Sequence, residues 1–228
     1  MSQPTYEPGP LFITGGGTGY VGSRLIPRLL ERGHEVRVLA RKESTGKLPP
    51  GCRIVEGNPL DSRTFAKEVT GASTFVQLVG VAKPAPWKGA AFRAVDLVSA
   101  RASLKAAASA RVRHFVYVSV AHPAPIMKAY IAVRRTCEEE IRAAQVAATF
   151  IRPWYILGPG HQWPLLLQPI YKLMTFIPAT KEAAQRLGLV TIDEMLAALV
   201  WAVEHPPEGV RIIDVPEIRR LGSVKRCS

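Results

Sequence analysis

Short apolar segments rich in β-branched residues alternate along this chain with longer segments of helical periodicity. The predicted strands span residues 11–14, 35–40, 53–56, 74–79, 114–120, 148–152 and 210–215. The predicted helices span residues 20–32, 61–69, 90–110, 127–144 and 191–204. Regular alternation of this kind predicts a parallel sheet with helices on both faces. Right-handed crossovers then give a doubly wound α/β sheet, a Rossmann fold, with ligands beyond the carboxyl ends of the strands.

The pattern changes after Pro153. Residues 164–178 form an apolar stretch of helical length, broken by polar residues and a proline, and residues 191–204 open with Thr191 and Glu194 as a capping box. The remaining tail is too short for a second independent domain. We therefore expect one domain over residues 1–228, in which residues 153–228 contribute a small C-terminal cap on the substrate side.

The composition is that of a soluble globular protein, with 47% hydrophobic and 21% charged residues. No stretch reaches the roughly 18 uncharged apolar residues of a membrane-spanning helix. Residues 1–10 lack the pattern of a secretory signal, so we expect a cytoplasmic protein. The three cysteines and five histidines show neither a C-x-x-C nor an H-E-x-x-H spacing, which argues against a disulfide framework or a zinc site.

The net charge of +12 is the unusual bulk property. Basic residues are spread along the whole chain and aromatic residues make up only 7%, so no basic stripe interleaved with stacking aromatics is present. We expect no specific nucleic-acid partner and interpret the charge as a basic, soluble surface. The sequence leaves open whether the protein is a monomer or a homodimer.

The strongest motif is the segment Thr14-Gly-Gly-Gly-Thr-Gly-Tyr-Val-Gly22, which follows the first predicted strand and opens the first helix. Gly16, Gly19 and Gly22 form G-x-x-G-x-x-G, where glycine permits a tight turn and close approach of the backbone to a pyrophosphate. The helix N-terminus supplies free N–H groups and the positive end of a dipole. The alternative is a plain tight turn, but its place between strand and helix favours dinucleotide binding. The expected contacts from this turn come from Gly16, Thr18, Gly19, Tyr20 and Val21.

The second predicted strand ends at Arg41 and Lys42. Proteins of this design that bind NAD usually carry an acidic residue there, which holds the adenosine ribose hydroxyls. Two cations suit a 2′-phosphate instead, and an arginine can bind it with two hydrogen bonds. We therefore expect NADP as the cofactor, with NAD less favoured. The competing interpretation is a solvated basic loop.

With these residues in place, the chain resembles the extended and atypical short-chain dehydrogenases/reductases over about residues 10–215. That group includes sugar-nucleotide epimerases, NmrA-like redox-sensing proteins and the NAD(P)H-binding accessory subunit of respiratory complex I. Thr14–Gly22 matches the group's T-G-x-x-G-x-x-G fingerprint. Residues 57–61 resemble its G-D-L-x-D segment, with Asn58 in place of the aspartate that meets adenine. Val79 and Gly80 fall where the group's backbone passes the cofactor ribose.

The resemblance also implies an active site. Ser119 matches the group's serine position, and the Arg152-Pro153 and Gly158–Gly160 segments resemble the R-P-x-x-x-x-G-P stretch that passes the nicotinamide. Pro153 is therefore an implied cofactor contact. In the Y-x-x-x-K frame the chain has Tyr130 and Arg134, so an arginine replaces the lysine that holds the ribose and lowers the tyrosine pKa.

Tyr130 and Arg134 lie one helical turn apart and can address one ligand together. Arg134 can bind a ribose but cannot deprotonate, which removes a proton relay through a neutral amine. In the catalytic interpretation Tyr130 is a general acid, Ser119 polarises a carbonyl and Arg134 supports both cofactor and phenol. In the structural alternative the tyrosine packs against its helix and the arginine extends to solvent. The sequence does not separate the two.

Weaker candidates follow. His122 and His161 lie in predicted loops near the expected pocket, but neither has an evident partner. The apolar segment 163–177 either closes a substrate pocket or makes a peripheral contact with an anionic membrane surface.

Two functions are consistent with these features. The first is an NADP(H)-dependent oxidoreductase, or a related epimerase, acting on a small carbonyl, alcohol or sugar-nucleotide-like substrate. The second is a non-catalytic NAD(P)(H)-binding redox sensor or an assembly or accessory protein, in one version associated with a membrane or a quinone. The arginine at position 134 motivates this alternative.

Overall fold

The computed structural model describes residues 9–14, 16–160 and 186–224 of the chain. Seven strands form one sheet in the order β3-β2-β1-β4-β5-β6-β9, and every neighbouring pair is parallel. These strands are β1 Leu11–Thr14, β2 Val36–Ala40, β3 Arg53–Glu56, β4 Thr74–Gln77, β5 His114–Val118, β6 Ala148–Ile151 and β9 Val210–Ile213. The predicted doubly wound sheet is confirmed.

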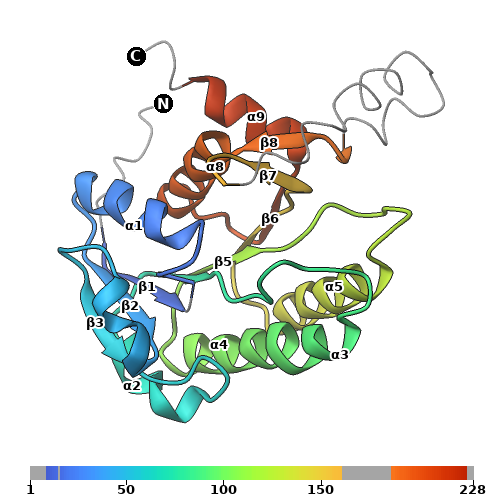
Figure 1. Cartoon of the computed structure of the whole chain (residues 1–228). Coiled ribbons are helices and arrows are strands. Elements are labelled where there is room, and N and C mark those ends of the chain that lie inside the picture. The colour runs from blue at the N-terminus through green and yellow to red at the C-terminus, as the bar shows by residue number, and fades with distance from the viewer. Residues whose placement is uncertain (1–8, 15, 161–185, 225–228) are drawn as a thin grey trace.

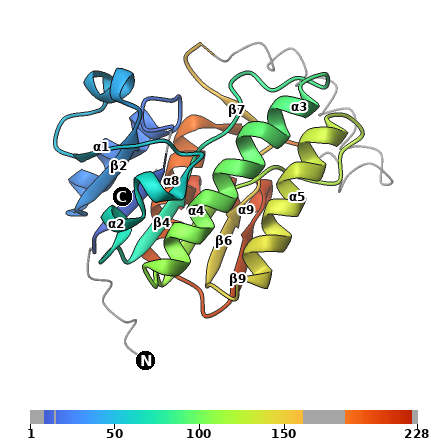
Figure 2. The same ribbon diagram turned by 90° about the horizontal axis from the view of Figure 1, so that it is seen from below.

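Helices cover both faces of this sheet (Figure 1). One layer contains α1 Gly22–Glu31, α8 Ile192–Glu204 and α9 Val215–Val224. The other contains α2 Ala66–Val69, α3 Gly89–Ala91, α4 Val98–Ser109 and α5 Lys128–Ala143. Figure 2 shows α4 and α5 side by side across the second face. Short 3₁₀ turns η1 (Lys42–Lys47) and η2 (Ser62–Thr64) lie in the connections, and a π-helical segment η3 (Phe92–Leu97) joins α3 to α4.

Alternation of side chains along each strand produces two cores. Leu11 and Ile13 of β1 face the α1 and α8 layer, where they meet residues such as Leu25 and Met195. Phe12 faces the opposite layer and stacks on Phe75, with ring centroids 5.3 Å apart. Strands buried on both faces in this way are typical of parallel sheets.

The order of strands reverses between β1 and β4. The chain runs outward from β1 to β3 and then crosses back to place β4 on the other side of β1. In doubly wound sheets, ligands bind beyond the carboxyl ends of the strands at such a reversal. This switch point positions the site described below.

The C-terminal part of the described chain is built into the sheet and its helical layers. β9 pairs with β6, and α8 contacts α1 and α9. Thr191 and Glu194 form the predicted capping box at the start of α8. Two short strands that the sequence pattern did not reveal, β7 (Tyr155–Leu157) and β8 (Leu189–Thr191), pair in parallel beside it. The expected cap stays a prediction, because residues 161–185 lie outside the described residues.

Within the described part of the chain, no helix is both long and apolar enough to cross a membrane.

Candidate dinucleotide-binding site

The turn between β1 and α1 is tightly folded around three glycines. Gly16 adopts a positive φ of 64°, and its carbonyl oxygen accepts a hydrogen bond from the amide of Gly19 at 2.8 Å. A Cβ atom at Gly19 would lie 3.0 Å from that oxygen, and one at Gly22 would overlap it. The turn therefore depends on glycine for both its backbone conformation and its packing. Gly15 lies outside the described residues.

The glycine turn leads directly into α1, and the amides of Ser23 and Arg24 donate to the carbonyls of Gly19 at 3.0 Å and Val21 at 3.2 Å. The first N–H groups of a helix have no partner within the helix, and the helix dipole adds positive potential at the same end. Thr18 is exposed at the tip of the turn, while Tyr20 and Val21 are half-buried. The guanidinium of Arg24 lies over the Tyr20 ring, 4.3 Å from its centroid. A glycine cradle ending on a helix N-terminus fits a pyrophosphate.

Basic residues follow β2, as the sequence indicated. Arg41 is exposed over 65% of its side chain and forms a 3.2 Å ion pair with Glu43, which is equally exposed. Lys42 begins η1 and is also exposed. An ion pair this open to solvent contributes little stability, so an incoming phosphate can displace Glu43 from Arg41.

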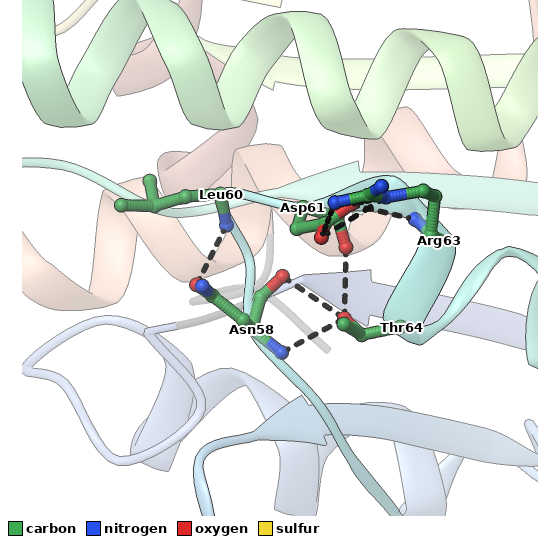
Figure 3. Close-up of polar contacts among 5 residues, drawn as sticks. All are labelled: Asn58, Leu60, Asp61, Arg63 and Thr64. Carbon is green, nitrogen blue, oxygen red and sulfur yellow. Dashed lines mark hydrogen bonds and ion pairs between the residues drawn. The ribbon is translucent and has the colours of Figure 1, made fainter.

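The loop after β3 is held by its own side chains (Figure 3). The Asn58 side-chain oxygen accepts a hydrogen bond from the backbone amide of Leu60 at 3.0 Å. The backbone amide of Asn58 donates to the Thr64 hydroxyl at 2.9 Å. Asp61 caps η2 by accepting from the Arg63 amide at 3.1 Å. The predicted helix 61–69 is thus split into η2 and α2. The side-chain oxygen of Asn58 is therefore occupied by a hydrogen bond within the loop.

A buried polar network joins β1 to β4 at this switch point. Gln77 accepts from the Thr14 hydroxyl at 2.8 Å and from the Val79 amide at 2.9 Å, and its own amide donates to Ser99 at 3.2 Å. The oxygen of Leu78 would lie 3.0 Å from a Cβ atom at Gly16. The network therefore brings Val79 close to the glycine turn.

Arg134 is buried in the described structure and does not extend to solvent. One guanidinium nitrogen donates to the Val118 carbonyl at 2.9 Å and to the Tyr117 hydroxyl at 3.2 Å. The other forms a 2.6 Å ion pair with Asp96, which is itself buried. A Cβ atom at Gly80 would lie 2.6 Å from this second nitrogen, so Gly80 leaves the room that the guanidinium needs. The structural alternative of a solvated arginine is thereby excluded.

Tyr130 packs against the guanidinium of Arg134. Its ring lies against Phe92, with centroids 4.9 Å apart, and the Arg134 guanidinium lies 5.0 Å from its centroid. Tyr130 and Arg134 are thus brought together at the carboxyl ends of β4 and β5, close to Gly80. Their roles as proton donor and cofactor ligand stay predictions.

Ser119 and Pro153 belong to a neighbouring cluster around Glu138. Arg152 binds the Glu138 carboxylate through two nitrogens, one of them at 2.9 Å, and Arg142 adds a contact at 3.2 Å. Burial opposes ionisation of Glu138, but the hydrogen bonds from Arg152, with a smaller contribution from the nearby Ser119 hydroxyl, outweigh it and hold the pKa of the carboxyl below its ordinary value. Pro153 is buried and accepts from the amide of Ala121 at 2.9 Å. The Ser119 hydroxyl thus lies next to Glu138, and its role on a substrate carbonyl stays a prediction.

The weaker candidates are only partly described. His122 contacts the Val120 carbonyl through Nδ1 at 3.0 Å, and burial lowers the pKa of its imidazole. His161 and the segment 163–177 lie outside the described residues. Sequence reasoning missed Asp96 and Glu138. Asp96 is a single acidic residue in an apolar helical segment, which is a usable signal, whereas Glu138 stands in a run of three glutamates and has none.

Comparison with known proteins supports the binding of a dinucleotide. A family model described as NAD(P)H-binding matches residues 16–162. Ceramide reductase of Caulobacter vibrioides is 28% identical over 216 residues, which cover 94% of this chain and 66% of that protein. A 3 beta-hydroxysteroid dehydrogenase/Delta 5-->4-isomerase of Mycobacterium tuberculosis is 32% identical over 121 residues, 50% of this chain and 32% of that protein. The chain therefore spans about two thirds or less of the length of these relatives.

Among solved structures, a short-chain dehydrogenase/reductase superfamily protein from Agrobacterium tumefaciens with bound NAD aligns with a TM-score of 0.66. The alignment has 19% identity and covers 90% of this chain and 76% of that one, so it supports the fold. The family model covers more than half of the chain and includes most of the glycine turn. The chain therefore belongs to the NAD(P)H-binding family and has a Rossmann fold.

Proposed function

We propose that this protein is an NADP(H)-dependent oxidoreductase that acts on a small, partly apolar carbonyl or alcohol, or on a sugar-nucleotide-like substrate. The observation that carries the proposal is the convergence of three features at one switch point: the glycine cradle, the Val79–Gly80 backbone, and the pair Tyr130 and Arg134. Two curated relatives are named as a ceramide reductase and a hydroxysteroid dehydrogenase, which supports a carbonyl or hydroxyl group on an apolar molecule.

The residues of the chain fit a dinucleotide in distinct ways. The amides after Gly16 would bind the pyrophosphate, and Asn58 would face the adenine, as the family resemblance implies. The Nε–H of Arg134 is buried and has no hydrogen-bond partner in the described residues, which leaves it as a donor for a ribose hydroxyl. When bound, the reduced nicotinamide would supply the hydride. Tyr130 would supply the proton to the substrate oxygen.

A substrate screen tests the catalytic part of this proposal. Oxidation of NADPH is followed with ceramide-type ketones, 3-keto steroids and nucleotide-sugar ketones. We expect turnover with one of these classes and a loss on the order of 100-fold in kcat for Tyr130→Phe, because general acid catalysis contributes at least that factor. The NADPH affinity of the variant is the control and is expected to stay unchanged, since the ring still packs on Phe92. Undiminished turnover of the variant would refute the role of Tyr130.

The cofactor preference is tested at Arg41. The Arg41→Asp variant should bind NADPH about 10- to 100-fold more weakly, because hydrogen bonds to a charged group contribute about 1.5–3 kcal/mol. Binding of NADH should change little. Arg113→Asp is the matched control, since Arg113 is exposed just before β5, at the opposite end of the strands. Equal affinity of the unaltered protein for NADPH and NADH would contradict the NADP assignment.

A second function is favoured by one specific observation. Arg134 stands where the family has lysine and is already engaged by Asp96, which is consistent with a protein that binds NAD(P)(H) without turning over a substrate. Such a redox sensor or accessory protein would gain thermal stability from NADPH, because a ligand that binds the native state stabilises it. A rise in Tm with NADPH, together with no NADPH oxidation for any substrate of the screen, would favour this function.

A further inference from the structure

Asp96 lies in an unusual place for a carboxylate. It belongs to the π-helical segment η3, between the apolar residues Val95 and Leu97, and only 1% of its surface is exposed. Its two oxygens accept from the Val81 amide at 3.1 Å and from Arg134 at 2.6 Å. π-helical turns in longer helices are often found at functional sites. The proposed function gives Asp96 no role.

The contact with Asp96 changes what Arg134 can do electrostatically. A guanidinium is charged at every pH that a protein experiences, and alone it would favour ionisation of a nearby phenol. Here a buried carboxylate lies 2.6 Å from that charge and balances it. The Val118 carbonyl and the Tyr117 hydroxyl engage the other guanidinium nitrogen. Tyr130 therefore faces a neutral ion pair instead of an isolated cation.

The groups around Tyr130 come from three elements. Arg134 and the Cys137 thiol lie on its own helix, Asp96 and the Phe92 ring come from η3, and Tyr117 of β5 binds the far side of the guanidinium. Burial raises the pKa of the Tyr130 phenol above its ordinary value; Arg134 opposes this effect and Asp96 adds to it. The thiol is neutral, since burial raises the pKa of Cys137 as well.

We propose that Asp96 is a positioning residue that fixes Arg134 beneath Gly80 and balances its charge, so that Tyr130 stays protonated at neutral pH and acts as a proton donor and not as a base. The catalytic meaning of this inference rests on the proposed function. In carbonyl reduction the phenol O–H bond breaks as a new O–H bond forms on the substrate oxygen, and the phenolate regains its proton from water. Alcohol oxidation would need the phenolate at the outset, so it should require alkaline pH.

The test is a direct titration of the phenol. Tyrosinate absorbance is recorded against pH for the full chain and for Tyr130→Phe, and the difference isolates Tyr130. We expect no ionisation of Tyr130 below its ordinary pKa of 10.0. In Asp96→Asn the uncompensated guanidinium should lower the phenol pKa by about 1–3 units. Glu140→Gln is the control, because Glu140 lies on the same helix but pairs with Arg101 at the surface. It should leave the titration unchanged.

The outcomes separate this inference from the proposed function. Ionisation of Tyr130 well below pH 10 in the unaltered protein, or an unchanged titration in a folded Asp96→Asn protein, overturns the inference. If Asp96→Asn does not fold, ionisation of Tyr130 well below pH 10 in the unaltered protein would still overturn the inference. Absence of turnover together with the expected titration would instead refute only the catalytic function.

Discussion

Replacement of Gly22 by alanine is expected to weaken dinucleotide binding severely. The added Cβ would overlap the carbonyl oxygen of Gly16 and crowd the Cα of Gly17, so the turn must open. Loss of two charge-assisted hydrogen bonds at about 1.5–3 kcal/mol each corresponds to a weakening of roughly 100-fold or more. Forced packing of this kind also lowers stability by about 1–3 kcal/mol. The measurement is NADPH affinity by fluorescence, at a temperature where circular dichroism shows the variant folded.

Gly46→Ala is the matched control for this experiment. Gly46 lies in the nearby turn η1, and a Cβ atom there would meet nothing within 4 Å. It should bind NADPH like the unaltered protein. The expected loss of NADPH affinity in Gly22→Ala is far larger than about twofold. If the affinity changed by no more than that, the turn would not be the phosphate cradle.

Replacement of Glu138 by glutamine is expected to give a large loss of stability. Glu138 is 1% exposed and binds Arg152 through both carboxylate oxygens. Removing one partner of a buried ion pair leaves the other charge uncompensated, which costs about 3–5 kcal/mol. Chemical denaturation of the unaltered protein and of Glu138→Gln at pH 7 gives the difference in their free energies of unfolding. Glu139→Gln is the control, because the neighbouring Glu139 is exposed and should tolerate the change.

The same pair makes stability depend on pH. The pKa of Glu138 is lower in the folded protein than its ordinary value of 4.5, so the unfolded chain takes up the proton first as the pH falls. The stabilisation is therefore complete above about pH 4.5 and is lost as the pH falls through the folded value. The difference in unfolding free energy between the unaltered protein and Glu138→Gln should shrink over that range. A difference that stayed constant with pH would contradict an ionised Glu138.

Much of the fold could be predicted from the sequence because its strands are buried on both faces. Such strands appear as short apolar runs, and β1 has the predicted bounds. The edge strand β3 is mostly exposed, but its bounds also agree with the prediction. The three-residue strands β7 and β8 were missed, since segments so short carry no periodicity. Helix α9 was also missed, because the pattern was interpreted as ending with the last strand.

The long predicted helix 90–110 shows where periodicity fails. The segment is helical, but η3 adds a π turn that shifts the face of the residues before Val98. That shift buries Asp96, which a regular helical pattern does not indicate. The glycine turn and the Tyr130–Arg134 pair could be predicted because they are local in sequence. The partner of Arg134 could not, since it lies 38 residues away and is selected by tertiary packing.

The position of α8 has a consequence for synthesis of the protein on the ribosome. The residues assigned to the dinucleotide all precede residue 160, but α8, which covers the sheet beside α1, is formed by residues 192–204. A nascent chain that has emerged only to residue 160 therefore exposes the apolar face of β5 and β6 that α8 will cover. Until the last third of the chain emerges, that face is a binding surface for chaperones and a starting point for aggregation.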